Sequence, residues 1–266
     1  MLPTPSTTHV NINRIYEPAE DSFLLLDTLS SPSEIQFLKQ RFNAKGRIDG
    51  DDGLNSAAPL ILEVGTGSGV VLAFITAHAK VLFGRVDVLT VGADINPFAC
   101  QATELTVGRA CRERAEAGKM YGKCLGVLNS DLATAFRPGM VDVLVFNPPY
   151  VPTSPLIRAL ESDFERTPLN LGSSDQRDLE DSRLLSLSYA GGIDGMEVTE
   201  RLLEQIPSLL TKDRGVAYVL LCRQNKPEEV MKRIRTRGSG WSVETVRHSG
   251  KIGGWEKLQV IRIWCT

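Results

Sequence analysis

The sequence shows no strong excess of charge of either sign. Its 266 residues include 30 Lys and Arg against 32 Asp and Glu, which leaves a formal net charge of −2. A protein that binds nucleic acid or an anionic membrane over a broad surface carries a clear positive excess. The totals therefore support neither class, although a local basic cluster is compatible with them. Hydrophobic and charged contents of 42% and 23% are ordinary for a globular protein.

Cysteine is sparse, and the sequence contains no C-x-x-C pair. The five cysteines are scattered and odd in number: Cys100, Cys111, Cys124, Cys222 and Cys265. This pattern predicts reduced thiols and no structural zinc site within the chain. The histidines are equally scattered and suggest no metal site: His9, His78 and His248.

Long apolar runs and a leader pattern are also missing. No run approaches the length of a membrane span, and the first 21 residues lack a basic region followed by an apolar core. Together with reduced thiols, these absences predict a soluble intracellular protein of the cytoplasm, or of the cytoplasm and nucleus. The length suits one large α/β domain or two small ones.

From residue 59 onward, apolar runs typical of strands alternate with helical patterns. Strands are expected within 59–64, 86–94, 123–131, 141–146 and 214–222, with helices at 70–80, 97–117, from about 196, and at 227–237. Such alternation predicts a mostly parallel sheet with helices on both faces. Two final strands, 241–249 and 257–265, are separated by too few residues for a helical crossover, so they should pair antiparallel. We predict a seven-stranded α/β fold that ends in an antiparallel hairpin.

The domain organisation follows from the polar stretches. Residues 1–14 are polar and contain proline, which predicts a flexible N-terminal arm, and residues 15–266 are expected to form a single domain. Within it, polar insertions are expected near 43–58 and 161–182. Disorder is one interpretation of both insertions. The second could instead line a substrate groove.

A glycine-rich loop follows the first predicted strand, in the sequence "LEVGTGSG" (62–69). Glycines there let the backbone approach a ligand closely and point its amides at it. The spacing G-x-G-x-G departs from the G-x-G-x-x-G of dinucleotide sites. Moreover, Glu63 would repel a pyrophosphate but would suit a ligand with an ammonium group. These features disfavour a nicotinamide cofactor.

Two further acids end the next strands. Asp94 could accept hydrogen bonds from the two hydroxyls of a ribose, or it could cap the helix that begins near Pro97. Asp131 could accept from an adenine amino group beside the backbone amide of Leu132, or it could serve only a turn. Because the carboxyl ends of parallel strands meet at one edge of a sheet, the loop and acids should form one site. A nucleoside with an amino-acid tail fits it, and S-adenosylmethionine is such a ligand.

The fourth predicted strand ends in "NPPY", Asn147-Pro148-Pro149-Tyr150. An amide or adenine amino nitrogen has a delocalised lone pair and is a poor nucleophile. Two acceptors that hold its N–H groups can aim that lone pair at a methyl donor. The Asn147 side-chain oxygen and the Pro148 carbonyl can be those acceptors, the prolines stiffen the loop, and Tyr150 can pack against the planar group. A rigid corner without chemistry is the alternative.

The combination resembles the class I S-adenosylmethionine-dependent methyltransferases. More closely, "YEPAEDSFLLLDTL" (16–29), "LEVGTGSGVV" (62–71), "ADINP" (93–97), "DVLVFNPPYV" (142–151) and "AGGIDGMEVTERLL" (190–203) resemble the HemK-type protein-glutamine methyltransferases, in their short eukaryotic form. The resemblance implies a Rossmann-like fold and N5-methylation of the glutamine of a Gly-Gly-Gln sequence in a class 1 translation release factor.

The resemblance also implies roles for individual residues. Asn147, Pro148 and Tyr150 would be catalytic and, with Pro149, would hold the glutamine. The residues expected to bind the cofactor are Ser22, Glu63, Gly65, Thr66, Gly67, Asp94, Ile95, Asp131, Leu132 and Asn147. A small zinc-binding activator subunit is the implied partner in a heterodimer. Bacterial relatives carry a helical recognition domain for which this chain has no room, and the two polar insertions are longer than the short form leads one to expect.

Three other functions are compatible with parts of the pattern. An adenine-N6 methyltransferase would also use N-P-P-Y, but it needs phosphate contacts. The one basic cluster comprises Lys226, Lys232, Arg233, Arg235, Arg237, Arg247 and Lys251. A solvated outer face of the helix that begins near Pro227 is the simpler interpretation of this cluster. A protein-lysine methyltransferase must deprotonate a flexible ammonium, for which N-P-P-Y is less suited. A non-catalytic scaffold would be expected to have lost the glycine loop or N-P-P-Y, and this chain keeps both.

Overall fold

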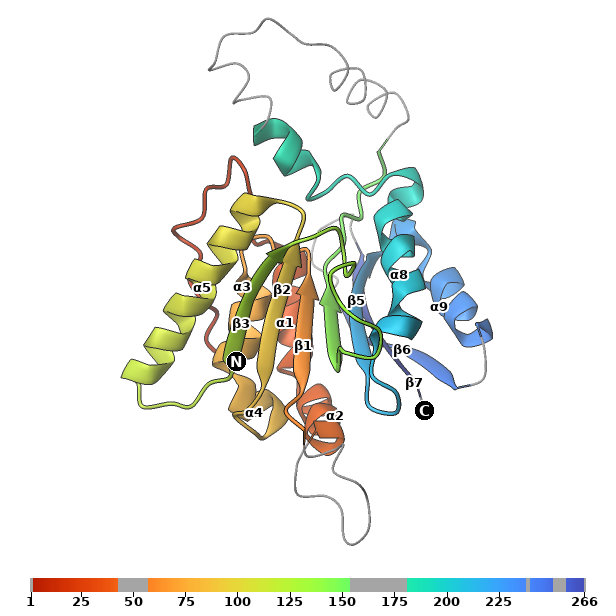
Figure 1. Cartoon of the computed structure of the whole chain (residues 1–266). Coiled ribbons are helices and arrows are strands. Elements are labelled where there is room, and N and C mark those ends of the chain that lie inside the picture. Colours follow the sequence, from red (N-terminus) through yellow and green to blue (C-terminus); the bar gives the residue numbers. More distant parts are fainter. Residues whose placement is uncertain (1, 43–56, 154–180, 238–239, 251–256, 266) are drawn as a thin grey trace, which may run out of the picture.

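The chain forms one seven-stranded sheet flanked by helices (Figure 1). The computed structural model describes residues 2–42, 57–153, 181–237, 240–250 and 257–265. The strands are β1 (Leu60–Val64), β2 (Leu89–Asp94), β3 (Lys123–Asn129), β4 (Val143–Phe146), β5 (Val216–Cys222), β6 (Trp241–His248) and β7 (Leu258–Cys265). Their order across the sheet is β3-β2-β1-β4-β5-β7-β6, and only β7 runs antiparallel to its neighbours. The predicted parallel sheet with a terminal antiparallel hairpin is confirmed.

The helices include the predicted ones and two further helices before residue 59. They are α1 (Glu20–Leu29), α2 (Pro32–Phe42), α3 (Val70–Ala77), α4 (Ala79–Phe83), α5 (Pro97–Glu116), α8 (Glu197–Leu209) and α9 (Pro227–Thr236), with short 3-10 turns η2 (Ile193–Gly195) and η3 (Arg223–Asn225). Asn96 caps α5 by accepting a hydrogen bond from the Phe98 amide, and Pro97 occupies the first turn. The cap of this helix is therefore Asn96 and not Asp94.

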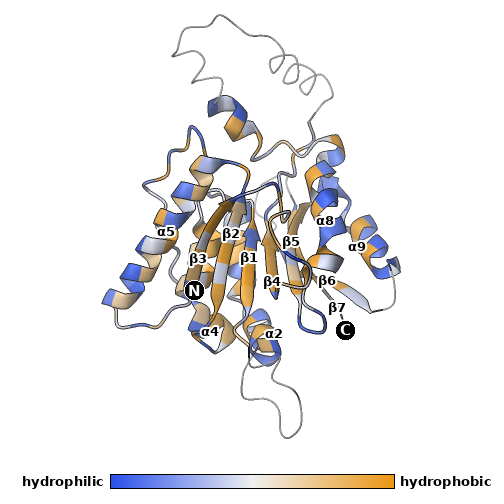
Figure 2. Cartoon of the chain, viewed as in Figure 1, coloured by the Kyte–Doolittle hydropathy of each residue, from blue (hydrophilic) through white to orange (hydrophobic). Residues whose placement is uncertain are grey.

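Two hydrophobic cores lie on the two faces of the sheet. Alternate residues of each strand point to opposite faces, so Leu62 and Leu144 pack in the core under α8 and α9. Ile61 and Val143 pack on the other face, in the core formed by α1 to α4. Strands β1, β4 and β5 are buried along their whole length. Figure 2 shows these central strands as the most hydrophobic part of the molecule, with hydrophilic residues on the outer helix surfaces.

The segment before α1 lies against α3 and α5. His78 Nε2 lies 2.9 Å from the Pro3 carbonyl oxygen, and the Arg14 carbonyl accepts a 2.8 Å hydrogen bond from Asn96 Nδ2. The Arg14 guanidinium stacks 4.4 Å from the Phe98 ring centroid. The arm is thus attached near both of its ends, and its flexibility stays a prediction.

The predicted polar insertions fall mostly on 43–56 and 161–180, which lie outside the described residues. Their described ends lead into β1 and into helical residues 181–186. No helix among the described residues is long and apolar enough to cross a membrane. In the same part of the chain, no three His, Cys, Asp or Glu side chains are grouped as a metal site would require.

Candidate active site

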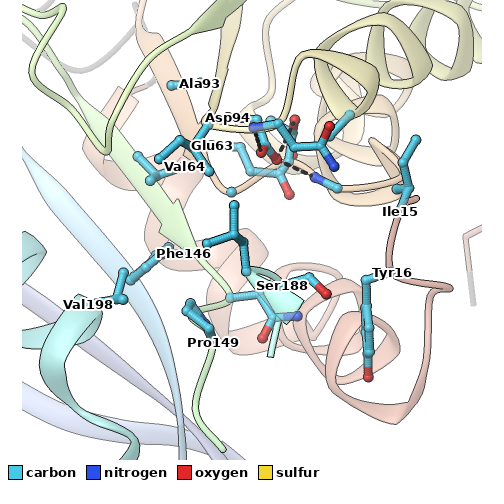
Figure 3. Close-up of a pocket in the computed structure, with 18 of the residues that line it drawn as sticks. Ile15, Tyr16, Glu63, Val64, Ala93, Asp94, Phe146, Pro149, Ser188 and Val198 are labelled. Carbon is cyan, nitrogen blue, oxygen red and sulfur yellow. Dashed lines mark hydrogen bonds between the residues drawn. The ribbon is translucent and has the colours of Figure 1, made fainter. Parts of the chain in front are cut away.

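A cavity lies at the carboxyl ends of β1, β2 and β4, where Val64, Asp94 and Phe146 reach it. This is the edge at which parallel α/β sheets bind ligands. All of the residues expected to bind a cofactor line this cavity: Ser22, Glu63, Gly65, Thr66, Gly67, Asp94, Ile95, Asp131, Leu132 and Asn147. Figure 3 shows Glu63 and Asp94 on one side of it, and Pro149 and Ser188 on another. The structure brings these residues together, and their contacts with a cofactor stay predictions.

The glycine loop between β1 and α3 is held against α5. Gly69 has a φ of +77°, and a Cβ built on it would lie 2.5 Å from the Thr103 Cα, so only glycine allows this close approach. Thr103 Oγ1 donates a 2.9 Å hydrogen bond to Thr66 Oγ1, and Thr106 Oγ1 donates one of 2.6 Å to the Ser68 carbonyl. Buried threonines of α5 therefore fix the loop at the rim of the cavity.

Glu63 and Asp94 form the acidic side of the cavity. Glu63 is 2% exposed, and its Oε2 has no hydrogen-bond partner among the described residues. Burial, with a smaller repulsion from Asp94, raises the pKa of Glu63 well above its ordinary range. A buried carboxylate without a partner is costly unless a cation or donor reaches it. The site is thus arranged for a ligand that brings a positive group.

Asp94 fixes the backbone at the entrance to the cavity. Its Oδ2 accepts a 2.9 Å hydrogen bond from the Gly67 amide, and its Oδ1 accepts one of 2.8 Å from the Asn96 amide. Burial raises the pKa of Asp94, and these hydrogen bonds oppose the increase. Thr66 Oγ1 donates a further hydrogen bond of 3.5 Å to Oδ2, so only part of the carboxylate's about four lone-pair sites remains for ribose hydroxyls. The ribose contact of Asp94 stays a prediction.

Asn147 follows β4 and lines the cavity. Its Nδ2 donates a 3.1 Å hydrogen bond to Oδ2 of Asp21, at the start of α1. Its Oδ1 is buried and has no hydrogen-bond partner within the described chain. An unsatisfied acceptor in a cavity is unusual in a folded protein and suggests a missing donor. An N–H group of a substrate would satisfy it.

The remaining residues of N-P-P-Y differ in their position relative to the cavity. Pro149 lines the cavity, whereas Pro148 and Tyr150 are buried and do not. The Tyr150 carbonyl accepts a 3.2 Å hydrogen bond from the buried Asn225 side chain, and a Cβ built on Gly195 would overlap that carbonyl oxygen. This packing fixes the C-terminal end of the N-P-P-Y loop. The expected substrate contacts of Pro148 and Tyr150 stay predictions.

Asp131, beyond β3, has a partner that the sequence did not suggest. It forms an exposed ion pair with Arg201 of α8, and both residues line the cavity. Leu132 adopts a φ of +52°, which is uncommon for a branched residue and turns the chain around the rim. An adenine amino group that binds Asp131, as expected, would share the Asp131 carboxylate with Arg201.

The sequence analysis did not predict some of the residues that line the cavity. Tyr16 and Asp21 belong to "YEPAED", which marked the segment but gave neither residue a role. Arg201 and Ser188 come from the region after the second polar insertion, and no local pattern distinguished them. A residue that reaches a site from a distant element leaves no spacing signal in the sequence.

Comparison with known proteins gives consistent relatives. The chain is 33% identical over 267 aligned residues to the mouse protein "Methyltransferase HEMK2", covering 98% of this chain and 96% of the relative. It is 29% identical to "eRF1 methyltransferase catalytic subunit mtq2" of Schizosaccharomyces pombe, covering 99% of this chain and 96% of that one. No model of a protein family matches the chain.

A solved structure agrees with the fold. The Mtq2–Trm112 complex of E. cuniculi superposes with a TM-score of 0.52 at 21% identity, covering 95% of this chain and 99% of that one. That likeness supports the fold alone. The family rests on the mouse relative, whose identity extends over nearly the full length of both chains: this protein belongs to the HEMK2 family of methyltransferases.

Proposed function

We propose that this chain transfers a methyl group from S-adenosylmethionine to the side-chain nitrogen of the glutamine in a Gly-Gly-Gln sequence of a class 1 translation release factor. The fission-yeast relative is named as a catalytic subunit acting on eRF1, and a 27%-identical archaeal relative as a putative protein N5-glutamine methyltransferase. The observation that carries the proposal is the buried Asn147 Oδ1, which has no partner in the described chain and can accept a hydrogen bond from a substrate N–H group.

The polar groups of the cavity support the proposed cofactor. The unpartnered Oε2 of Glu63 suits the ammonium of the amino-acid tail, and Asp94 has capacity left for ribose hydroxyls. Ile95 is 52% exposed at the rim, where it can cover an adenine ring. When bound, S-adenosylmethionine supplies an electrophilic methyl group on a sulfonium. The residues of this chain would then have to position a weak nucleophile, the amide nitrogen of the glutamine, next to that methyl group.

The chain holds the acceptor nitrogen rather than deprotonating it first. Asn147 Oδ1, together with the Pro148 carbonyl, would accept the two N–H groups and so direct the lone pair toward the methyl group. Pro148 and Pro149 restrict the loop, so that the acceptors are ordered before the substrate arrives. A strong general base is unnecessary, because the nitrogen loses its proton readily after it is alkylated.

An adenine target in nucleic acid finds less support. The basic residues near the C-terminus are largely engaged within the protein. Lys226, Arg233 and Arg247 pair with Asp194, Glu200 and Asp27, and Arg235 and Arg237 donate to the Val243 and Leu203 carbonyls. Lys251 lies outside the described residues. Cations with intramolecular partners release fewer counterions from a phosphate backbone.

We further propose that the active form is a heterodimer with a small zinc-binding activator. The solved E. cuniculi neighbour is a complex of Mtq2 with Trm112. In this chain, β3 is an edge strand, and five large apolar side chains are exposed on it, on α5 and on the segment that joins the two: Leu105, Met120, Tyr121, Leu125 and Leu128. An unpaired edge with exposed apolar side chains is suited to a protein partner.

Mass spectrometry of labelled products tests the function. The chain and its activator are incubated with isotopically labelled S-adenosylmethionine and, separately, a release factor, duplex DNA and single-stranded RNA. We expect the label on the glutamine of Gly-Gly-Gln and no label when that glutamine is replaced by alanine. Label on nucleic acid, with none on the release factor, would overturn the proposal in favour of a base methyltransferase.

A further inference from the structure

The hydrogen bond between Asn147 and Asp21 joins two distant parts of the chain. Asp21 lies in the first turn of α1, 126 positions before Asn147, and is 3% exposed. Its Oδ1 accepts hydrogen bonds from the Ser22 amide at 2.6 Å and from the Ser22 hydroxyl at 3.2 Å. These bonds hold the carboxylate in one orientation and leave Oδ2 for Asn147 Nδ2. The position of Asp21 is therefore fixed independently of Asn147.

The charge of Asp21 determines which way the Asn147 amide faces. An ionised carboxylate can only accept hydrogen bonds, so the group that faces it must be the NH2 of the amide. The carbonyl end, Oδ1, then has to point away, and there it is buried without a partner. The opposite orientation would place two acceptors against each other and expose a donor to the substrate nitrogen. Without Asp21, nothing in the described chain selects between the two orientations.

We propose that Asp21 is a positioning residue for methyl transfer, whose carboxylate locks the Asn147 amide with Oδ1 toward the acceptor nitrogen. This rests on the proposed function in one respect, because it requires a substrate that donates N–H groups. The negative charge behind Nδ2 also polarises the amide and strengthens Oδ1 as an acceptor. Asp21 acts through Asn147, so its effect should appear in turnover more than in substrate affinity.

The variant Asp21→Asn gives a sharp test because it keeps the size of the side chain. An asparagine at position 21 has one oxygen where the carboxylate has two, so it cannot accept from both Ser22 and Asn147. When its oxygen faces Ser22, its NH2 faces Asn147 and favours the unproductive amide orientation. The matched control is Asp27→Asn on the same helix, where the half-buried carboxylate pairs with Arg247 at 3.6 Å and lies outside the site.

The kinetic experiment compares these variants in complex with the activator. For Asp21→Asn we expect kcat to fall about 10- to 100-fold, while KM for the protein substrate and the cofactor Kd change less than about threefold. Asp27→Asn should match the wild type. In an Asn147→Ala background, Asp21→Asn should cost less than about twofold further, because the two act as one unit. Independent, additive losses, or a kcat within twofold of the wild type, would overturn the proposal.

A spectroscopic measurement tests the same hydrogen bond without any turnover. In protein labelled with 15N-asparagine, the Asn147 side-chain signals are identified by their absence from Asn147→Ala. We expect one of its two NH2 hydrogens to exchange slowly with water in the wild type and rapidly in Asp21→Asn. Equal exchange in both proteins would refute the role of Asp21. If the wild type methylates another substrate, the proposed function fails, and the Asp21 comparison is made on that substrate.

Discussion

At the scale of single residues, the buried carboxyl group of Glu63 lowers the stability of the protein at high pH when no ligand is bound. Its carboxyl is buried beside Asp94, and the pKa values of both groups are raised by burial. A carboxyl whose pKa is higher in the folded state than in the unfolded state takes up a proton on folding. Its stabilising contribution is complete below about pH 4 and is lost as the pH rises through the raised folded-state pKa. The ligand-free protein should therefore lose stability toward alkaline pH.

The substitution Glu63→Gln tests this balance. Without cofactor, we expect the variant to have a Tm about 2–4 °C higher than the wild type at pH 8.5, and the difference to vanish toward pH 4. Its S-adenosylmethionine affinity should fall about tenfold or more, because the ammonium loses its counter-charge. Thermal denaturation across pH and calorimetric titration measure the two effects. The exposed Glu113→Gln is the control, and parallel pH profiles for Glu63→Gln and the wild type would contradict the assignment.

The sequence allowed the fold and the cavity residues at the strand ends to be predicted because both follow from local patterns. Apolar runs that end in glycine or acid indicate strand ends, and parallel strands bring those ends together, as Glu63 and Asp94 show. The pairing of Asn147 with Asp21 could not be predicted, since it depends on packing between α1 and the end of β4. The hydrogen bond from the Asn225 side chain to the Tyr150 carbonyl is another contact that no spacing reveals.

At the scale of elements, β3 is the part of the sheet best placed to meet another protein. Among the described strands it pairs only with β2, and its register shifts where Leu125 and Gly126 interrupt the ladder. Leu125 and Leu128 are 54% and 43% exposed. Soluble proteins usually protect such edges with charge or cover. An apolar edge that is left open is more consistent with a permanent partner than with a free monomer.

A charge placed on this edge should weaken heterodimer formation. For Leu125→Asp we expect the Kd for the activator to rise about tenfold or more, equivalent to about 1.4 kcal/mol of binding free energy. Met140→Asp introduces the same charge at another exposed apolar residue, before β4, and should bind as the wild type does. Calorimetric titration and co-purification provide the measurement. Equal affinities for both variants would place the partner elsewhere on the molecule.

At the scale of the whole molecule, a buried polar cluster joins the N-terminal helices to the C-terminal strands. Glu34 of α2 accepts a 2.7 Å hydrogen bond from Tyr218 of β5 and pairs with Arg262 of β7 at 2.7 Å. The Arg262 guanidinium also stacks 3.6 Å from the Phe37 ring centroid. Burial and the neighbouring Glu34 raise the pKa of Tyr218 well above its ordinary range, so the phenol stays a donor. Elements from opposite ends of the chain are thereby held on one side of the sheet.

Removing the charge of Glu34 should destabilise the fold without touching the chemistry. Glu34→Gln leaves Arg262 buried with only the outer Glu244 as a counter-charge, and an unpaired buried ion costs several kcal/mol. We expect the free energy of unfolding to fall by about 2–4 kcal/mol in urea titrations. Asp27→Asn, which removes an exposed ion pair, should change it by less than about 1 kcal/mol. Because Glu34 does not line the cavity, turnover at 25 °C should match the wild type as long as Glu34→Gln remains folded. A loss of turnover in the folded variant would mean that the cluster also supports the active site, through α1 and Asp21.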